Sequence, residues 1–305
     1  MPLDTSEQQP SVFEPVPTIK MRGHLHEGVI AGARCRWWVY GKEDAPPLVL
    51  IHGFRGDHHG LELIAQGLED YCVYIPDLPG FGRSEAIPGA EHTISSYAAW
   101  LVDFIELTNP SPVHLVGHSF GSIITSYTAL VRPQLFTRLT LINPICQPAL
   151  EGEQKIMTRL AELYYGAGAC LPSGLGFALL RSRLVTRLSS EYMMKTQDPE
   201  LRAFINSQHD AYFGSFASRD AVLQAYRASI SGTAADFAPS VPLPVQMIVA
   251  EKDDLGTLEL QEQMAASLQQ GRFDLIPAVG HLIHYETPLR AAALIKEFNR
   301  EGLEL

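Results

Sequence analysis

The chain has 305 residues, 46% of them hydrophobic, so it is long enough to bury one large core. It carries 23 Lys and Arg against 34 Asp and Glu, and the resulting net charge of −11 argues against nucleic acid or an anionic membrane as its main partner. A small neutral molecule is the expected partner. The four cysteines are widely spaced, include no CxxC pair, and are too few for a disulfide framework.

The first part of the chain, residues 1–17, is rich in proline and polar residues. It has neither a basic start nor an apolar run, so we expect a flexible tail rather than a signal peptide, and a cytoplasmic protein. Two long segments without Lys, Arg, Asp or Glu, residues 107–131 and 163–180, contain polar residues or repeated Gly and Pro. A membrane span should be more apolar and less interrupted, so no stable membrane insertion is expected.

From residue 18 onward, strand-like and helix-like segments alternate. The expected strands are residues 18–26, 33–40, 48–51, 71–75, 112–116 and 139–142, and the expected helices are residues 57–67, 94–107 and 119–130. The first two strands should form a hairpin. Strands that alternate with helices at this spacing predict an α/β fold with a mostly parallel sheet flanked by helices.

The alternation stops after residue 145. Residues 146–240 show helical periodicity and no convincing buried strand. It resumes with strands at residues 244–250 and 273–276 and with helices at residues 257–268 and 288–300. The sequence therefore predicts a core made of residues 18–145 and 241–305, with residues 146–240 inserted as a helical cap over the carboxyl edge of the sheet.

The pentapeptide Gly117-His118-Ser119-Phe120-Gly121 lies between an expected strand and an expected helix. A serine on so tight a strand-to-helix turn holds its hydroxyl above the sheet, and the crowded backbone leaves no room for a Cβ atom two residues away on either side. Glycine at both flanks meets that demand. The pattern therefore indicates that Ser119 is a nucleophile.

An acid and a histidine follow other strands at the same expected edge. Asp253 comes after the strand that ends at Ala250, and His281 comes after the strand that ends near Ile276. Open parallel sheets bind ligands beyond the carboxyl ends of their strands, so these side chains should approach Ser119. Their order along the chain is Ser, Asp, His, which is the order that this sheet topology requires.

The chain resembles the α/β-hydrolase fold superfamily, as a serine-nucleophile member with a cap, from about residue 18 to residue 298. The motifs that carry the resemblance are His52-Gly53-Phe54, Asp77-Leu78-Pro79-Gly80-Phe81-Gly82-Arg83-Ser84, the pentapeptide, Glu251-Lys252-Asp253 and Gly280-His281. The resemblance implies that His281 is the base that activates Ser119, that Asp253 orients His281, and that the backbone N–H groups of Phe54 and Phe120 form the oxyanion hole.

Some of these assignments have rivals. Asp254 adjoins Asp253, but the family places its acid three residues after the small residue that ends the strand, here Ala250. His284 competes with His281 as the base, although it falls at the start of an expected short helix. Some relatives carry their acid after the strand at residues 139–142, where this chain has Asn143-Pro144, which favours the later acid.

An aromatic stripe in the expected cap is a candidate substrate pocket. His209, Tyr212, Phe213 and Phe216 recur at i, i+3, i+4 and i+7, as one face of a helix over residues 206–219. The alternative is packing inside the cap.

The remaining histidines give no reason to expect a metal. His58-His59 after Asp57, and His24 with His26, come without a matching carboxylate or cysteine group at ligand spacing, so we expect no metal and no cofactor.

By elimination and analogy, the predicted function is hydrolysis of a small to medium apolar carboxylic ester through an acyl-enzyme. Relatives that hydrolyse epoxides or remove halogen carry aspartate in place of Ser119. Relatives that cleave carbon-carbon bonds of ring-fission products often have asparagine and an aromatic residue where this chain has His118 and Leu282, but that activity stays open. So do perhydrolase or haloperoxidase activity without a cofactor and a small-molecule receptor on the same fold. The oligomeric state is not predicted.

Overall fold

The computed structural model describes residues 12–16, 18–108, 112–147 and 155–301. Parts of the expected tail (residues 1–11 and 17) and of the expected cap (residues 148–154) lie outside this range. In the described part of the chain, eight strands form one sheet in the order β1-β2-β4-β3-β5-β6-β7-β8. Only the pairings of β2 with β1 and with β4 are antiparallel, so the predicted α/β fold with a mostly parallel sheet is confirmed.

The elements alternate along the chain as the sequence predicts. The strands are β1 (His24–Ile30), β2 (Ala33–Gly41), β3 (Pro47–Ile51), β4 (Cys72–Pro76), β5 (Val113–His118), β6 (Phe136–Ile142), β7 (Val245–Ala250) and β8 (Gly271–Ile276). The core helices are α1 (His59–Gln66), α2 (Ile94–Thr108), α3 (Phe120–Val131), α9 (Leu258–Ser267), α10 (Ile283–Glu286) and α11 (Pro288–Arg300).

The first strand lies later in the chain than predicted. The hairpin is present, but β1 is His24–Ile30 rather than residues 18–26. Its loop consists of Ala31 and Gly32, both with positive φ (49° and 78°), between the paired residues Ile30 and Ala33. Two-residue hairpin loops favour positive φ at both positions because this matches the twist of the strands, so β1 runs directly into the turn.

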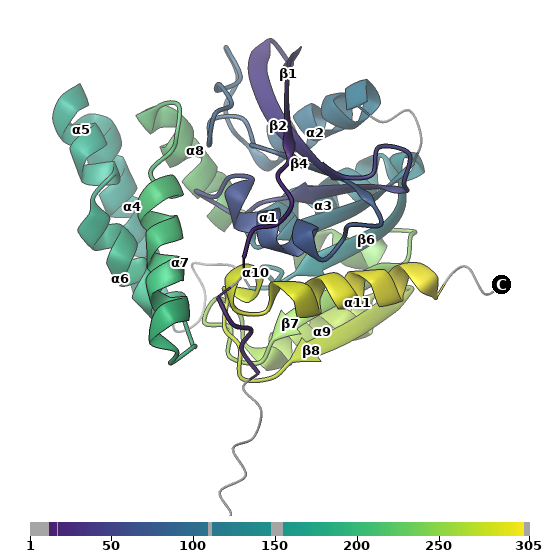
Figure 1. Ribbon diagram of the computed structural model, residues 1–305. Coiled ribbons are helices and arrows are strands. Elements are labelled where there is room, and N and C mark those ends of the chain that lie inside the picture. The colour runs from purple at the N-terminus through teal and green to yellow at the C-terminus, as the bar shows by residue number, and fades with distance from the viewer. Residues whose placement is uncertain (1–11, 17, 109–111, 148–154, 302–305) are drawn as a thin grey trace, which may run out of the picture.

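Helices cover both faces of the sheet (Figure 1). Helices α1 and α11 contact each other and bury their apolar residues against one face. Helices α2, α3 and α9 contribute Trp100, Ile123 and Met264 to the core on the other face. Because both faces are covered, the central strands are buried along their whole length, as in β5, where all six residues are buried, His114 and His118 included.

A group of helices lies between β6 and β7 in the sequence, and we call it the inserted helices. It comprises α4 (Lys155–Cys170), α5 (Ser173–Leu180), α6 (Arg183–Met193), α7 (Pro199–Tyr212) and α8 (Arg219–Ile230). They stand together beside the sheet, teal to green at the left of Figure 1. No helix within the described ranges is long and apolar enough to span a bilayer.

Candidate active site

The candidate site is built on the turn between β5 and α3. Ser119 occupies this turn with φ 54° and ψ −120°, a conformation that is strained for any residue with a side chain. A Cβ atom on Gly117 would lie 2.2 Å from Thr125 Oγ1, and one on Gly121 would lie 2.4 Å from the carbonyl oxygen of Ile51. Both contacts are impossible, which confirms the reason expected for the two glycines. The two glycines therefore let the turn pack closely against β3 and α3.

Gly121→Ala should destabilise the fold by about 1 to 3 kcal/mol or prevent folding, because the added methyl group meets a strand carbonyl that cannot move aside. Gly166→Ala in α4 is the matched control, since a Cβ atom there meets nothing within 4 Å. Removing a helix glycine should stabilise that variant by about 0.5 to 1 kcal/mol. Urea unfolding followed by circular dichroism measures both changes. Equal unfolding midpoints for Gly121→Ala and the wild type would contradict the steric argument.

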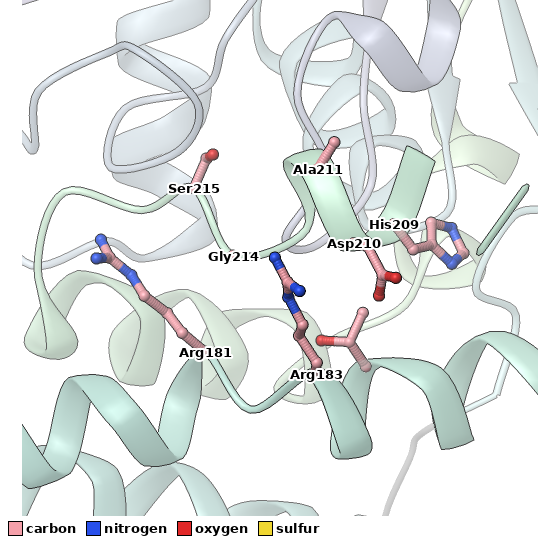
Figure 2. Close-up of a pocket in the computed structure, with 8 residues that line it drawn as sticks. Arg181, Arg183, His209, Asp210, Ala211, Gly214 and Ser215 are labelled. Carbon is pink, nitrogen blue, oxygen red and sulfur yellow. The ribbon is translucent and has the colours of Figure 1, made fainter. Parts of the chain in front are cut away.

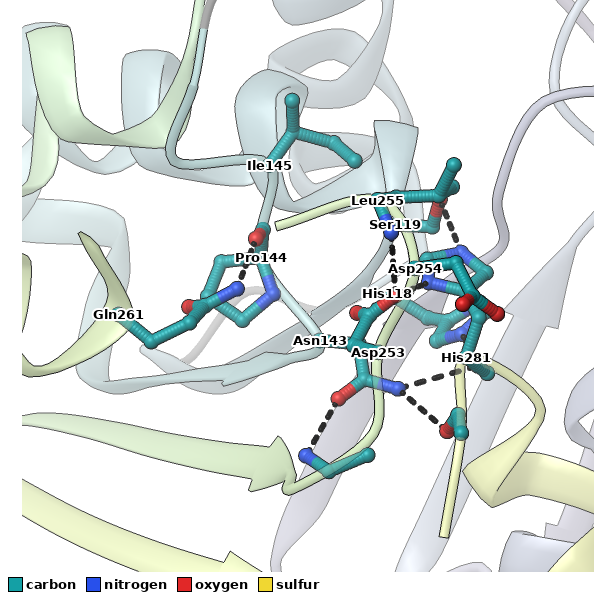
Figure 3. Close-up of polar contacts among 12 residues, drawn as sticks. His118, Ser119, Asn143, Pro144, Ile145, Asp253, Asp254, Leu255, Gln261 and His281 are labelled. Atoms are coloured by element: carbon teal, nitrogen blue, oxygen red, sulfur yellow. Dashed lines mark hydrogen bonds and ion pairs between the residues drawn. The ribbon is translucent and has the colours of Figure 1, made fainter. Parts of the chain in front are cut away.

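Three side chains from three segments form one chain of hydrogen bonds (Figure 3). Ser119 Oγ lies 2.9 Å from His281 Nε2, and His281 Nδ1 lies 3.0 Å from both carboxylate oxygens of Asp253. Ser119 and His281 are buried, at 8% and 4% exposure. A carboxylate at Nδ1 holds the ring N–H on that nitrogen and leaves Nε2 free to accept the Ser119 proton.

The rival residues point elsewhere. The Asp254 carboxylate forms an ion pair with Lys195 and no hydrogen bond with His281. His284 is buried in α10, and its ring makes no hydrogen bond to Ser119 or Asp253. Geometry thus favours Asp253 and His281 over the neighbours that the sequence left as alternatives.

Two backbone N–H groups beside Ser119 are free to bind an oxyanion. Phe120 opens α3, so its N–H has no partner within the helix, and the Phe54 N–H likewise donates to no other described residue. The loop that carries Phe54 lies against Ser119, since a Cβ atom on Gly53 would be 3.1 Å from the Ser119 Cβ. Both N–H groups therefore belong to segments that adjoin Ser119.

Ser119 and His281 line a cavity of about 240 Å³ between the sheet edge and the inserted helices. His209, Tyr212 and Phe213 from the aromatic stripe also line it. Phe216 does not: it is buried, pairs with Phe81 through an isolated bridge and stacks on Phe177. The predicted helix over residues 206–219 is wrong at its end, because α7 stops at Tyr212 and the i+7 position leaves the stripe.

The histidine that precedes Ser119 is uncharged in this site. Burial, with a smaller contribution from nearby His281, lowers the pKa of His118 to about 3. Its ring lies 5.3 Å from the His281 ring and 4.3 Å from the His284 ring. The hydrogen bond to Ser119 comes from His281 Nε2, whereas the His118 Nε2 atom lies 3.4 Å from the His281 carbonyl oxygen.

A sequence model of the alpha/beta hydrolase fold matches residues 46–288, which include the turn, the histidine and the acid. The chain belongs to the alpha/beta hydrolase fold family. The family resemblance expected from the motifs is thereby confirmed.

Individual relatives of this alpha/beta hydrolase are distant. (E)-2-((N-methylformamido)methylene)succinate hydrolase of Acinetobacter baylyi is 23% identical over 248 residues, 80% of this chain and 87% of that protein. The solved structure of a thermophilic esterase from Thermogutta terrifontis superposes with a TM-score of 0.71 at 22% identity, over 91% of this chain and 98% of that one. An enol-lactonase from Burkholderia xenovorans gives 0.75 at 16% identity, over 90% and 100%. At these identities the structural likeness shows the fold alone.

Two buried residues to which the sequence assigned no role hold the candidate site in place. The Asn143 side chain donates to the carbonyl oxygens of Gly280 and His281 and accepts from the N–H of Ala250, so it links the ends of β6 and β7 to the histidine loop (Figure 3). The Glu286 carboxylate accepts from the N–H groups of Gly280, Lys195 and Thr196. It therefore ties the histidine loop to the segment after α6.

Arg55 joins the other side of the site to the inserted helices. It is 2% exposed, and its guanidinium donates to the carbonyl oxygens of Leu180 (2.8 Å) and Phe213 (3.1 Å), at the carboxyl ends of α5 and α7. Helix carboxyl ends carry partial negative charge, which offsets the buried cation. The sequence offered no signal for this contact, because the helix ends lie far along the chain.

The histidine pair His58-His59 at the start of α1 was expected to lack a matching carboxylate. That detail is wrong: Asp57, His58 and His59 each offer a ligand atom, and these atoms lie within 4.8 Å of one another. The Nδ1 atoms are already hydrogen-bonded, His58 to Asp77 at 2.9 Å and His59 to Asp57 at 3.1 Å. These bonds anchor the loop that follows Phe54.

Proposed function

We propose that this alpha/beta hydrolase is a carboxylic-ester hydrolase that works through a serine acyl-enzyme. The observation that carries the proposal is the hydrogen-bonded chain from Ser119 through His281 to Asp253, at the wall of a cavity that can hold a small substrate. The strained backbone at Ser119 supports it, because strain of this kind collects at functional residues.

In the first step, the Ser119 oxygen attacks the ester carbonyl carbon while its proton passes to Nε2 of His281. The carbonyl oxygen becomes an oxyanion and accepts hydrogen bonds from the N–H groups of Phe54 and Phe120. When the intermediate collapses, the bond to the alkoxy oxygen breaks and His281 returns the proton to the departing alcohol. Asp253 stabilises the imidazolium that exists between these two transfers.

In the second step, water takes the place of the serine as nucleophile. His281 removes a proton from the water, which attacks the acyl carbon, and the proton then returns to the Ser119 oxygen as the acid leaves. We also propose that residues 146–240 act as the cap and that His209, Tyr212 and Phe213 contact the substrate, because they line the cavity.

The test is an assay with p-nitrophenyl esters of increasing acyl length, together with labelling by a fluorophosphonate probe. We expect turnover of acetate and butyrate to exceed that of longer esters, because a cavity of about 240 Å³ leaves little room for a long acyl chain. Peptide mass spectrometry should place the label on Ser119. No turnover at any length together with no labelling would overturn the proposal, and much faster cleavage of carbon-carbon substrates would favour the ring-fission alternative.

A further inference from the structure

One imidazole in the cavity wall makes no hydrogen bond. His284 is 7% exposed, and neither of its ring nitrogens bonds to any residue in the described ranges; its Nδ1 atom is fully buried. A neutral imidazole has one donor and one acceptor, and a buried polar group without a partner costs about 1 to 3 kcal/mol. The ring lines the same cavity as Ser119. Because Nδ1 is fully buried, Nε2 is the ring nitrogen that a group in the cavity can reach.

A second histidine from the inserted helices lines this cavity. His209 on α7 is 6% exposed, and its ring also makes no hydrogen bond within the described residues. Its ring centroid lies 5.5 Å from that of Tyr285, which is 4.3 Å from that of His284. Two unpaired imidazoles thus flank one tyrosine, one contributed by the core and one by the inserted helices.

Both rings are uncharged near neutral pH. Burial lowers the pKa of His209 to about 4. Burial also lowers the pKa of His284 well below its usual value, and the nearby His118, His209 and His281 reinforce the shift. These rings can donate or accept a hydrogen bond, but they do not offer a positive charge to an anion.

His209 also marks where the cavity approaches the solvent. It borders a second pocket of about 330 Å³, between the segment that carries Arg181 and Arg183 and the end of α7 (Figure 2). In Figure 2 the His209 ring lies on the far side of Asp210 from both arginines. His209 therefore lies between the two pockets, whereas His284 lies deeper in the cavity, with its ring centroid 4.3 Å from that of His118.

We propose that His284 and His209 form a polar subsite that binds a hydroxyl group on the ester substrate. This inference rests on the ester hydrolysis proposed above. A hydroxyl group both donates and accepts, so it satisfies either nitrogen of a neutral imidazole. A plain alkyl group would leave the nitrogens buried and unpaired, and sites built to hydrogen-bond a hydroxyl reject such analogues. Arg55, which lines the cavity, already donates to two helix carbonyls and to the Tyr165 hydroxyl, so the unpaired groups are those of the two neutral histidines.

Pairs of esters that differ by one hydroxyl in place of a methyl group test the subsite. Methyl 3-hydroxybutanoate against methyl 3-methylbutanoate probes the acyl side, and 2-hydroxypropyl butanoate against 2-methylpropyl butanoate probes the alcohol side. We expect wild-type kcat/KM to favour the hydroxylated ester of at least one pair by about 10-fold or more, which corresponds to about 1.4 kcal/mol.

His284→Phe should bring that ratio close to one, mainly by improving turnover of the alkyl ester, because phenylalanine fills the space without nitrogens. His284→Asn should keep part of the preference, since an amide can donate and accept. His209→Phe makes the same change on the side of the cavity formed by the inserted helices. It tests the subsite on its own if His284→Phe does not fold. His24→Ala, an exposed residue of β1, is the control and should leave the ratio unchanged.

The outcomes separate the two proposals. If the wild type hydrolyses neither member of any pair, the proposed ester hydrolysis has failed. If it hydrolyses both members at equal rates, or if His284→Phe and His209→Phe both leave the preference unchanged, ester hydrolysis stands and the subsite is overturned.

Discussion

Ser119→Ala should lower kcat for p-nitrophenyl butyrate by about 10³- to 10⁶-fold, while KM changes little. The methyl group removes the nucleophile but leaves the N–H groups of Phe54 and Phe120 and the cavity wall in place. Any residual rate would come from those groups and from water activated by His281. Steady-state kinetics of both proteins measures the loss of kcat, with the concentration of active wild-type enzyme set by active-site titration.

Ser126→Ala is the matched control, since it removes a buried hydroxyl from α3, the helix that follows Ser119. Ser126 Oγ has no hydrogen-bond partner in the described residues, so its removal should leave both kcat and the unfolding midpoint close to the wild type. A Ser119→Ala enzyme that keeps more than about a hundredth of the wild-type kcat would contradict a covalent role for this serine.

The features that sequence reasoning placed well are set by local demands. The glycines around Ser119 are needed because atoms of Thr125 and Ile51 fill the space of a Cβ atom, and such a demand leaves a motif that can be read from five residues. The alternation of strands and helices likewise predicts the parallel sheet, because each crossover must bury one helix face against it. The family match then agrees with the order of these motifs.

The features that sequence reasoning missed depend on contacts between distant parts of the chain. Asn143 gave no signal beyond being a poor candidate acid, because its partners at Ala250 and His281 meet it only in the folded sheet. The Arg55 contacts with Leu180 and Phe213 are of the same kind. The prediction that Phe216 lines the pocket failed for another reason. Helical periodicity holds only while the helix continues, and Gly214 follows shortly after α7 ends.

The adjacent acids provide the sharpest test of the orientation of His281. Asp253→Asn should lower kcat by about 10⁴-fold at neutral pH. An amide in place of the carboxylate can donate a hydrogen to Nδ1, which moves the ring proton to Nε2 and blocks the nitrogen that must accept from Ser119. It also removes the negative charge that stabilises the imidazolium.

Asp254→Asn is the control with the same chemical change one residue away. Its carboxylate pairs with Lys195, and both side chains are partly exposed, so losing the pair should cost at most about 1 kcal/mol of stability and leave kcat within about twofold. The measurement is kcat for both variants under conditions where each is folded. Loss of activity in Asp254→Asn but not in Asp253→Asn would contradict this assignment. The carboxylate at His281 Nδ1 would then not be the group that orients the base. Asp254 would have to take that place during turnover.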